Sequence, residues 1–554
     1  MKFPGNIFQV LFLLSFFAIG GCRNHKPDEK DIVKKPEQLE DRVRLNMNEI
    51  LKYTESNKGA LNDSVSLAYV NELKAVYDEN GYAALWSAQG IFLPAGDSLY
   101  AFITDSRKYG LFPKDYHFPS LSAIYRQLST DSLARKDAAL LSRSDIMLTD
   151  AMLRISRDLK RGRLPYDSLT SRKDTLLDEH FYLDVLQRAL KSGKVIASLH
   201  ELEPRLAGYQ DLKSGIAKFL DSANFNPFTI LPYPIKDTLD FNQLLQKRLV
   251  EERLIATPGA DTAALRRALM TYQTTKKIKS TGKINETTVN SLNDTDWERF
   301  KRIAISLDKY KLMPDTLPAT YVWVNIPSYQ LKLIDTDTIS LESRVIVGTP
   351  RTRTPELNSE ISNFITYPQW TVPYSIVFKE MLPQIQRNID YLRKQNLMVV
   401  DRYDSVIDPA KIDWSKLSKK KFPYQIKQRE GDDNSLGVLK FNFRNPYSVY
   451  LHDTNARWMF SKTSRALSHG CVRVQNYRNL ANFLVRNDSI RYHPDTLSSW
   501  ISRQEKHMVS GFKKVPIFIR YFTCEGRNGK VRFYDDIYAE DRLLAQKYFS
   551  KNIN

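Results

Sequence analysis

A cysteine and two histidines are the residues of this chain with the clearest capacity for chemistry. Cys471 follows a glycine in residues 468–473 (SHGCVR), and His452 precedes that motif in residues 450–453 (YLHD). A thiol performs acyl transfer as a thiolate, so an imidazole that can take its proton is the expected partner. The spacing of 471 − 452 = 19 positions leaves room for a strand, a loop and a return. The two side chains can therefore meet in space.

The segments around these residues have the alternation of β-strands. They are residues 321–326, 330–334, 344–348, 438–443 and 448–452. In the last of them Val449 and Leu451 share one face, and Tyr450 and His452 share the other. His452 then stands at the end of a strand, where a rigid sheet can hold a catalytic group. We expect a mostly-β domain with one or two helices over residues 318–525.

Two helical segments precede this domain, so the predicted fold class is multidomain α+β. Residues 55–235 predict a helical scaffold domain; the apolar stripe there recurs at helical spacing through Leu148, Met152, Ile155 and Leu159. Residues 240–295 predict three short helices. In that segment Gly282 is expected in a turn, and Asn285 is expected to cap the third helix. A C-terminal segment, 526–554, completes the chain.

The N-terminus predicts export. A positively charged start and an apolar run at residues 7–19 precede two glycines and Cys22. The run is too short to span a bilayer, and it is typical of a signal peptide covering residues 1–21. Small residues directly before a cysteine resemble the lipoprotein box of bacteria, which implies that Cys22 is lipidated. The alternative is an ordinary signal peptide. Residues 22–54 are charged and predict a solvated tether.

Charge and cysteine content narrow the function further. The net charge of +19 is typical of a protein that binds a polyanion. Export argues against nucleic acid, so a polyanionic cell wall or a membrane surface is the expected partner. A basic surface of solvated lysines explains the same charge without any partner. With Cys22 lipidated, only Cys471 and Cys524 remain, and a disulfide between them would silence the first. We expect Cys524 to be a small core residue.

Several motifs of the third domain together resemble one family. They are residues 324–329 (VNIPSY), 345–350 (VIVGTP), 370–373 (WTVP), 434–437 (NSLG), 451–454 (LHDT) and 468–473 (SHGCVR). This set resembles the L,D-transpeptidases with a YkuD-like catalytic domain, and the domain order resembles their large YcbB-like subgroup. Residues 240–295 resemble the small helical peptidoglycan-binding domain; the alternative is a helical spacer.

The resemblance implies a periplasmic enzyme that cross-links peptidoglycan. Cys471 would attack a tetrapeptide stem, release D-Ala and hold the stem as a thioester, which the amine of a second stem then takes in a 3→3 link. His452 would take the thiol proton and pass it to the leaving amine. The backbone carbonyl of Asp453 would orient His452. The N–H groups of Gly470 and Cys471 would bind the oxyanion.

The remaining candidate residues would shape the substrate pocket. The resemblance implies that His469 shapes the loop, and that Arg473 either binds a stem carboxylate or braces the cysteine loop. Ser468 is expected to bond to nearby backbone. Tyr450 and Trp370 are expected as pocket walls, with a place in the β core as the alternative. No cofactor and no metal is expected.

Other classes of function remain open from the sequence. A cell-wall L,D-carboxypeptidase or cysteine peptidase would use the same thiol and imidazole with water as acceptor. A non-catalytic lipoprotein could anchor the wall through residues 240–295. A zinc site is the third alternative, but the sequence offers only three ligands for it, His452, His469 and Cys471, and no second pair of cysteines. An insertion at about 375–433 is expected to be a lid that excludes water, or else a surface excursion. Arg23 after the lipidated cysteine favours the outer membrane as the site of the anchor.

Overall fold

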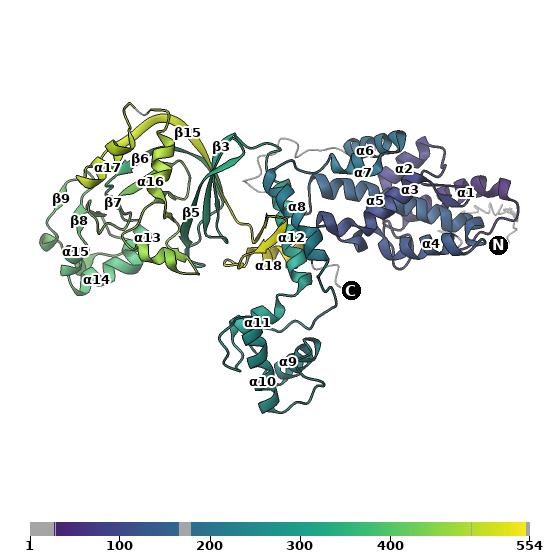
Figure 1. Ribbon diagram of the computed structural model, residues 1–554, viewed down its shortest axis with the longest axis horizontal. Helices are drawn as coiled ribbons and strands as arrows, with labels where there is room; N and C mark the ends of the chain where they lie inside the picture. The colour runs from purple at the N-terminus through teal and green to yellow at the C-terminus, as the bar shows by residue number, and fades with distance from the viewer. Residues whose placement is uncertain (1–26, 28, 166–178, 489, 550–554) are drawn as a thin grey trace, which may run out of the picture. The chain divides into compact units, whose positions relative to one another are not determined.

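The structure is a computed structural model that describes residues 27, 29–165, 179–488 and 490–549 (Figure 1). The signal peptide and Cys22 lie outside these residues. The chain forms two compact units. The first comprises Met1–Thr104, Pro113–Ser156 and Asp178–His200, and the second comprises Asp105–Phe112, Arg157–Leu177 and Glu201–Asn554. No helix in the described part of the chain is both long enough and apolar enough to cross a membrane.

The first unit is helical. Its elements are η1 (Pro36–Gln38), α1 (Leu39–Ser56), α2 (Val70–Glu79), β1 (Ser87–Ala88), β2 (Ile91–Phe92), α3 (Pro94–Thr104), η3 (Pro113–Tyr116), α4 (Phe118–Thr130), η4 (Ala134–Lys136), α5 (Ala138–Lys160), α6 (Glu179–Ser192) and α7 (Val195–His200). The apolar stripe predicted on α5 is confirmed, because Leu148, Met152, Ile155 and Leu159 are all fully buried. Burying such side chains supplies most of the stability of a helix in a folded unit.

The tether expected over residues 22–54 is wrong from residue 39 onward. Helix α1 buries Val43, Met47 and Ile50 on one face. The hydroxyl of Ser142 on α5 donates to the Val43 carbonyl at 3.0 Å. The charged residues between the apolar ones gave the segment a disordered composition, but their spacing places them on the solvent face of an amphipathic helix.

Further helices lie in the second unit. They are η2 (Ser106–Tyr109), α8 (Ala207–Leu220), α9 (Thr238–Glu251), α10 (Thr262–Thr275), α11 (Glu286–Asn293), α12 (Asp296–Lys311) and α18 (Glu540–Tyr548). Helices α9 to α11 share a small core of their own. The expected cap is confirmed: the Asn285 side chain accepts the Thr288 N–H at 2.9 Å. Gly282 has φ +64°, a left-handed turn conformation that favours glycine.

A nine-stranded sheet forms the body of the third predicted domain. Its strands are β3 (Thr320–Asn325), β4 (Gln330–Asp335), β5 (Thr338–Gly348), β6 (Leu357–Thr366), β11 (Leu439–Phe443), β12 (Leu451–His452), β13 (Ala466–Ser468), β14 (Val472–Val474) and β15 (Met508–Arg520). Their order is β13-β5-β14-β12-β11-β6-β15-β3-β4, and β5 also pairs with β4. The sheet therefore closes on itself, which encloses its apolar face.

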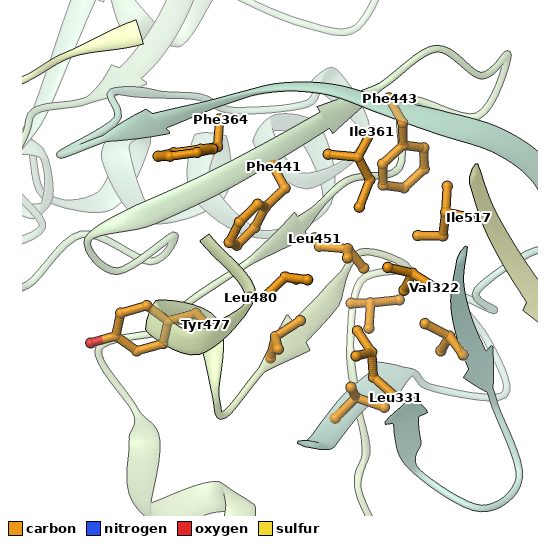
Figure 2. Packing of buried hydrophobic residues seen from close by; sticks show 14 of the residues in the cluster. Val322, Leu331, Ile361, Phe364, Phe441, Phe443, Leu451, Tyr477, Leu480 and Ile517 are labelled. Carbon is orange, nitrogen blue, oxygen red and sulfur yellow. The ribbon is translucent and has the colours of Figure 1, made fainter. Parts of the chain in front are cut away.

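The enclosed face is packed with side chains from alternate strand positions. Figure 2 shows Phe441 of β11 and Leu451 of β12 in this core, close to Leu480 of α16 (Tyr477–Leu484). Helix α17 (Pro494–Ser502) adds Leu497 to the same core. Because successive side chains of a strand point to opposite faces, the neighbours of Phe441 and Leu451 point away from the core. The outer face of β11 and β12 therefore carries the polar residues of the candidate site.

The insertion has its own sheet and its own core. Its elements are β7 (Trp370–Thr371), α13 (Tyr374–Ile376), the π-helical turn η5 (Val377–Met381), α14 (Leu382–Arg387), α15 (Asp390–Lys394), β8 (Leu397–Val400), β9 (Val406–Ile407), η6 (Pro409–Lys411), η7 (Trp414–Lys416) and β10 (Gln425–Gln428). The strands run in the order β7-β10-β8-β9. Buried Val377, Val399 and Ile426 belong to a cluster separate from the main core. The insertion is thus a small folded subdomain.

The chain continues its regular structure past residue 525. Strands β16 (Cys524–Arg527) and β17 (Lys530–Phe533) form a hairpin. A Cβ on Gly526 would lie 2.0 Å from the Asp211 carbonyl, so this hairpin packs closely on α8. Cys524 is fully buried, as expected, and its sulfur contacts the Ser306 hydroxyl at 3.1 Å. Cys524 and Cys471 are both free thiols.

Candidate active site

Cys471 stands on a short loop between β13 and β14 that is held by its own serine. The Ser468 hydroxyl donates to the Cys471 carbonyl at 2.6 Å and accepts the Gly470 N–H at 3.1 Å. The local backbone bonds expected of Ser468 are thus confirmed. Gly470 has φ +120°, a conformation open to glycine and strained for other residues. The loop therefore has one well-defined shape, and the thiol has a defined place.

A second brace comes from the loop after β5 and was not predicted. The Thr352 hydroxyl donates to the Ser468 carbonyl at 3.0 Å, and the Thr354 hydroxyl donates to the Gly470 carbonyl at 2.8 Å. The Thr354 N–H in turn donates to the Tyr538 hydroxyl at 3.1 Å. The threonine-rich run directly after the VIVGTP motif was the available signal in the sequence.

These bonds correct the expected oxyanion site. The Gly470 N–H is already occupied by the Ser468 oxygen, and its carbonyl by Thr354. The N–H of Cys471 makes no hydrogen bond with any residue that the structure describes. The open donor beside the thiol is therefore the Cys471 N–H, and Gly470 contributes by its backbone conformation.

We expect Gly470→Ala to cost about 1–3 kcal/mol of folding stability, because alanine is strained at this φ. Activity should fall further than stability explains, because the strain acts on the loop that carries the thiol. Gly529→Ala is the matched control, since Gly529 has φ +65° and open space around it. The measurement is chemical unfolding together with the rate of alkylation of Cys471. Equal alkylation rates in the two folded variants would contradict the prediction.

The polar face of the sheet places three side chains in one row. His452 on β12 is the register partner of Lys440 on β11 and of Arg473 on β14. Directly opposed residues on neighbouring strands point to the same face. Lys440, His452 and Arg473 therefore stand side by side. Lys440 was not singled out from the sequence, although its alternation with Leu439 and Phe441 placed it on the polar face.

His452 is buried and uncharged near neutral pH. It is 5% exposed, and burial lowers its pKa to about 3, with the positive charges of Arg473 and Lys440 acting in the same direction. The backbone carbonyls of Asp453 and Leu436 favour the protonated ring and so oppose this lowering of the pKa. The Nδ1 atom of His452 makes no hydrogen bond of good geometry with the described residues. A neutral imidazole is the form that can accept a proton. The Asp453 carboxylate is not the orienting group, because it accepts the Val438 N–H at 3.0 Å and pairs with Arg457.

The low pKa of His452 predicts a dependence of stability on pH. In the unfolded chain this imidazole titrates near 6.5, so between that value and about 3 the unfolded state binds more protons. Stability should therefore fall as the pH is lowered through this window. His452→Gln should reduce the slope of the unfolding free energy against pH by up to about 1.4 kcal/mol per pH unit. The measurement is urea unfolding at several pH values, with His493→Gln as the exposed control. Parallel slopes for wild type and His452→Gln would contradict the prediction.

The thiol of Cys471 is surrounded by Tyr450 and two cations. Burial raises its pKa, while the backbone N–H and hydroxyl of Tyr450, and the charges of Lys440 and Arg473, oppose that shift. The ring of Tyr450 also packs on His452, with centroids 5.6 Å apart. The Trp370 indole lies beside the Tyr450 hydroxyl without a hydrogen bond of good geometry. The structure thus brings the thiol, both aromatic residues and the polar row together.

His469 links the cysteine loop to the insertion. Its side chain is 45% exposed, and Nε2 lies 2.8 Å from a carboxylate oxygen of Glu380 in η5. Within the described residues no group of three or more His, Cys, Asp or Glu could hold a metal ion. The zinc site considered from the sequence is therefore not assembled here.

Comparisons with known proteins match two parts of the chain. Residues 71–215 match a scaffold domain, and residues 319–492 match the L,D-transpeptidase catalytic domain of the YkuD family. A Haemophilus influenzae protein named "Putative L,D-transpeptidase" is 34% identical over 252 residues, which is 44% of this chain and 49% of that protein. The chain thus spans about half the length of this curated relative.

A solved structure described as "Structure of the Ldtfm-avibactam carbamoyl enzyme" aligns with 50% of this chain and 87% of its own, at 13% identity and a TM-score of 0.16. A likeness this low carries no argument. The family match is the informative one, because it covers the cysteine loop, β11, β12 and the insertion. Residues 319–492 of this multidomain chain are therefore similar to the L,D-transpeptidase catalytic domain of the YkuD family.

Proposed function

We propose that this protein is a peptidoglycan L,D-transpeptidase that forms 3→3 cross-links through a cysteine thioester. The observation that carries the proposal is the free thiol of Cys471, on a braced glycine loop directly beside the strand of Tyr450 and His452. The match of residues 319–492 to the catalytic domain supports it. The substrate is the stem peptide of the cell wall, and the activity needs no cofactor.

In the first half-reaction Cys471 attacks the carbonyl that precedes the terminal D-Ala of a tetrapeptide stem. His452, which is neutral, takes the thiol proton as the S–C bond forms. The Cys471 N–H donates to the oxygen that becomes negative. The C–N bond then breaks, His452 gives the proton to the leaving amine, and D-Ala departs. The stem remains on the sulfur as a thioester.

In the second half-reaction the side-chain amine of another stem attacks the thioester. His452 takes a proton from this amine, the C–S bond breaks, and the thiol regains a proton. An amide replaces the thioester, so the bond energy of the first amide is conserved and no ATP is required. Tyr450 and Trp370 form walls of the pocket, and Arg473 holds a stem carboxylate.

The insertion serves as a lid in this proposal, as the YcbB-like subgroup would require. Its support is the contact between Glu380 of the insertion and His469 of the cysteine loop. A lid over the thioester excludes water and so favours the amine as acceptor over hydrolysis. The Glu380–His469 pair would open and close with it, since both side chains are about half exposed.

The proposal places the enzyme in the periplasm, anchored by a lipid on Cys22. Its support is the apolar N-terminal run that ends in two glycines before this cysteine. Arg23 directly after it favours the outer membrane. Helices α9 to α11 act as a peptidoglycan-binding domain, which agrees with the chain's net charge of +19 and the polyanionic wall.

The test is the intact mass of the protein after addition of a purified disaccharide-tetrapeptide, together with analysis of the peptide products. A thioester adduct with release of D-Ala and a 3→3 dimer is expected. A carbapenem should form a stable adduct on the same thiol. Hydrolysed stem without dimer would instead identify an L,D-carboxypeptidase or cysteine peptidase. A folded protein that forms no adduct would favour a wall-anchoring lipoprotein.

A further inference from the structure

Lys440 is a half-buried cation that has no carboxylate partner among the described residues, and the nearest group that can become negative is the Cys471 thiol. Its Nζ lies 4.3 Å above the ring of Tyr450, and it forms no hydrogen bond or ion pair with the described residues. The buried lysines of the same unit are paired: Lys309 with Asp541 at 2.7 Å and Lys311 with Asp308 at 2.8 Å. Desolvation of an unpaired ammonium is unfavourable, and it lowers the pKa of Lys440.

The position of Lys440 relates it to the reaction. Across β14, β12 and β11 one row holds Arg473, His452 and Lys440, and Cys471, two positions before Arg473, lies next to this row on the β14 side. The acyl carbon is bonded to the sulfur on the β14 side. The leaving nitrogen must lie at His452, which protonates it. The next side chain in the same direction is Lys440.

The leaving group brings its own anion to this place. In an amino acid the carboxylate carbon is two bonds from the nitrogen, about 2.5 Å away. A terminal carboxylate therefore lies directly beyond the nitrogen that His452 protonates. Arg473, the other cation of the row, is on the β14 side with the acyl group, and its Nη1 contacts the Met459 sulfur at 3.5 Å. Lys440 is the cation on the leaving-group side.

We propose that Lys440 is a specificity-determining residue that binds the free carboxylate of the departing D-amino acid. This inference rests on the proposed function and deepens it. The site then selects stems in which only one residue, with a free carboxylate, follows the bond that is cut. A donor without that terminal carboxylate leaves the half-buried ammonium unpaired. No bond to Lys440 forms or breaks in the reaction.

The test compares two donors, the disaccharide-tetrapeptide and the same molecule with a C-terminal carboxamide. Wild type should acylate with the acid at least about tenfold faster in kcat/KM, the effect of one charged hydrogen bond. Lys440→Met should lose that preference, mainly by slowing the acid donor, and Lys440→Arg should retain part of it. Lys462→Met is the matched control, because Lys462 lies over the ring of Trp458 in the same way.

The ratio of kcat/KM for the acid donor to kcat/KM for the amide donor separates recognition of the carboxylate from other effects of the substitution. A loss of positive charge near Cys471 also raises the thiol pKa, but this slows both donors by the same factor and leaves the ratio unchanged. An unchanged ratio in Lys440→Met would overturn the inference. If that variant does not fold, equal rates of wild type on the two donors overturn it as well. A wild type that reacts with neither donor would overturn the proposed function, and the inference with it.

Discussion

Replacing Cys471 with alanine is expected to abolish acyl-enzyme formation without unfolding the protein. The proposed reaction passes through a thioester on this sulfur, so removal of the sulfur leaves no route through that intermediate. We expect a fall of at least about 10³-fold in turnover of the tetrapeptide and no adduct by mass. The thiol makes a long contact of 3.8 Å to the Ser448 carbonyl, whereas the short hydrogen bonds that brace its loop run through Ser468, Thr352 and Thr354.

The matched control is Cys524→Ser, which removes the other free thiol of the described chain. Cys524 is buried on β16, and its sulfur contacts the Ser306 hydroxyl, so a serine can keep that contact. This variant should form the adduct at the wild-type rate. An adduct of the same mass on folded Cys471→Ala would show that a different residue is the nucleophile, and the proposed mechanism would fail.

Replacing His452 with asparagine is expected to lower the rate of acylation by about 10²–10⁴-fold. The variant keeps a polar side chain of similar size but cannot carry a proton from the thiol to the leaving amine. The thiol itself should remain present and countable by alkylation. The effect should appear in kcat rather than in KM, because His452 is 5% exposed and so offers little surface for binding the stem.

His469→Asn is the control for this prediction. His469 is half exposed and contacts Glu380 of the insertion, so its loss should disturb the loop contact and leave proton transfer intact. We expect a loss smaller than about tenfold, measured as the rate of adduct formation with a carbapenem. If the rate of adduct formation fell less in His452→Asn than in His469→Asn, the base would be another group beside the sulfur. The Tyr450 hydroxyl would then be the first group to test.

Local patterns in the sequence were sufficient to predict several features. The alternation of residues 448–452 separated Val449 and Leu451, now buried in the core, from Tyr450 and His452, whose rings pack on each other. The helical stripe of α5 and the Asn285 cap were predicted in the same way. Each depends on periodicity or on a bond between near neighbours, which a single segment of sequence contains in full.

Other features involve residues that are far apart in the chain. Thr354 braces the loop of Cys471 through Gly470, which is 116 positions away in the chain. Tyr538 in turn holds Thr354, from which it is separated by 184 positions. The insertion meets the same loop through Glu380, 89 positions from His469. No local pattern specifies such pairs. They depend on how the sheet closes and on which loops its edges bring together.

The sequence by itself determined that a thiol and an imidazole belong to one β domain, because their motifs and strand alternation are local. Tertiary structure decided which groups surround them. It assigned the Gly470 N–H to Ser468 and left the Cys471 N–H open. It also aligned Lys440 with His452, since the register between strands is set by packing of the whole sheet and not by either strand alone.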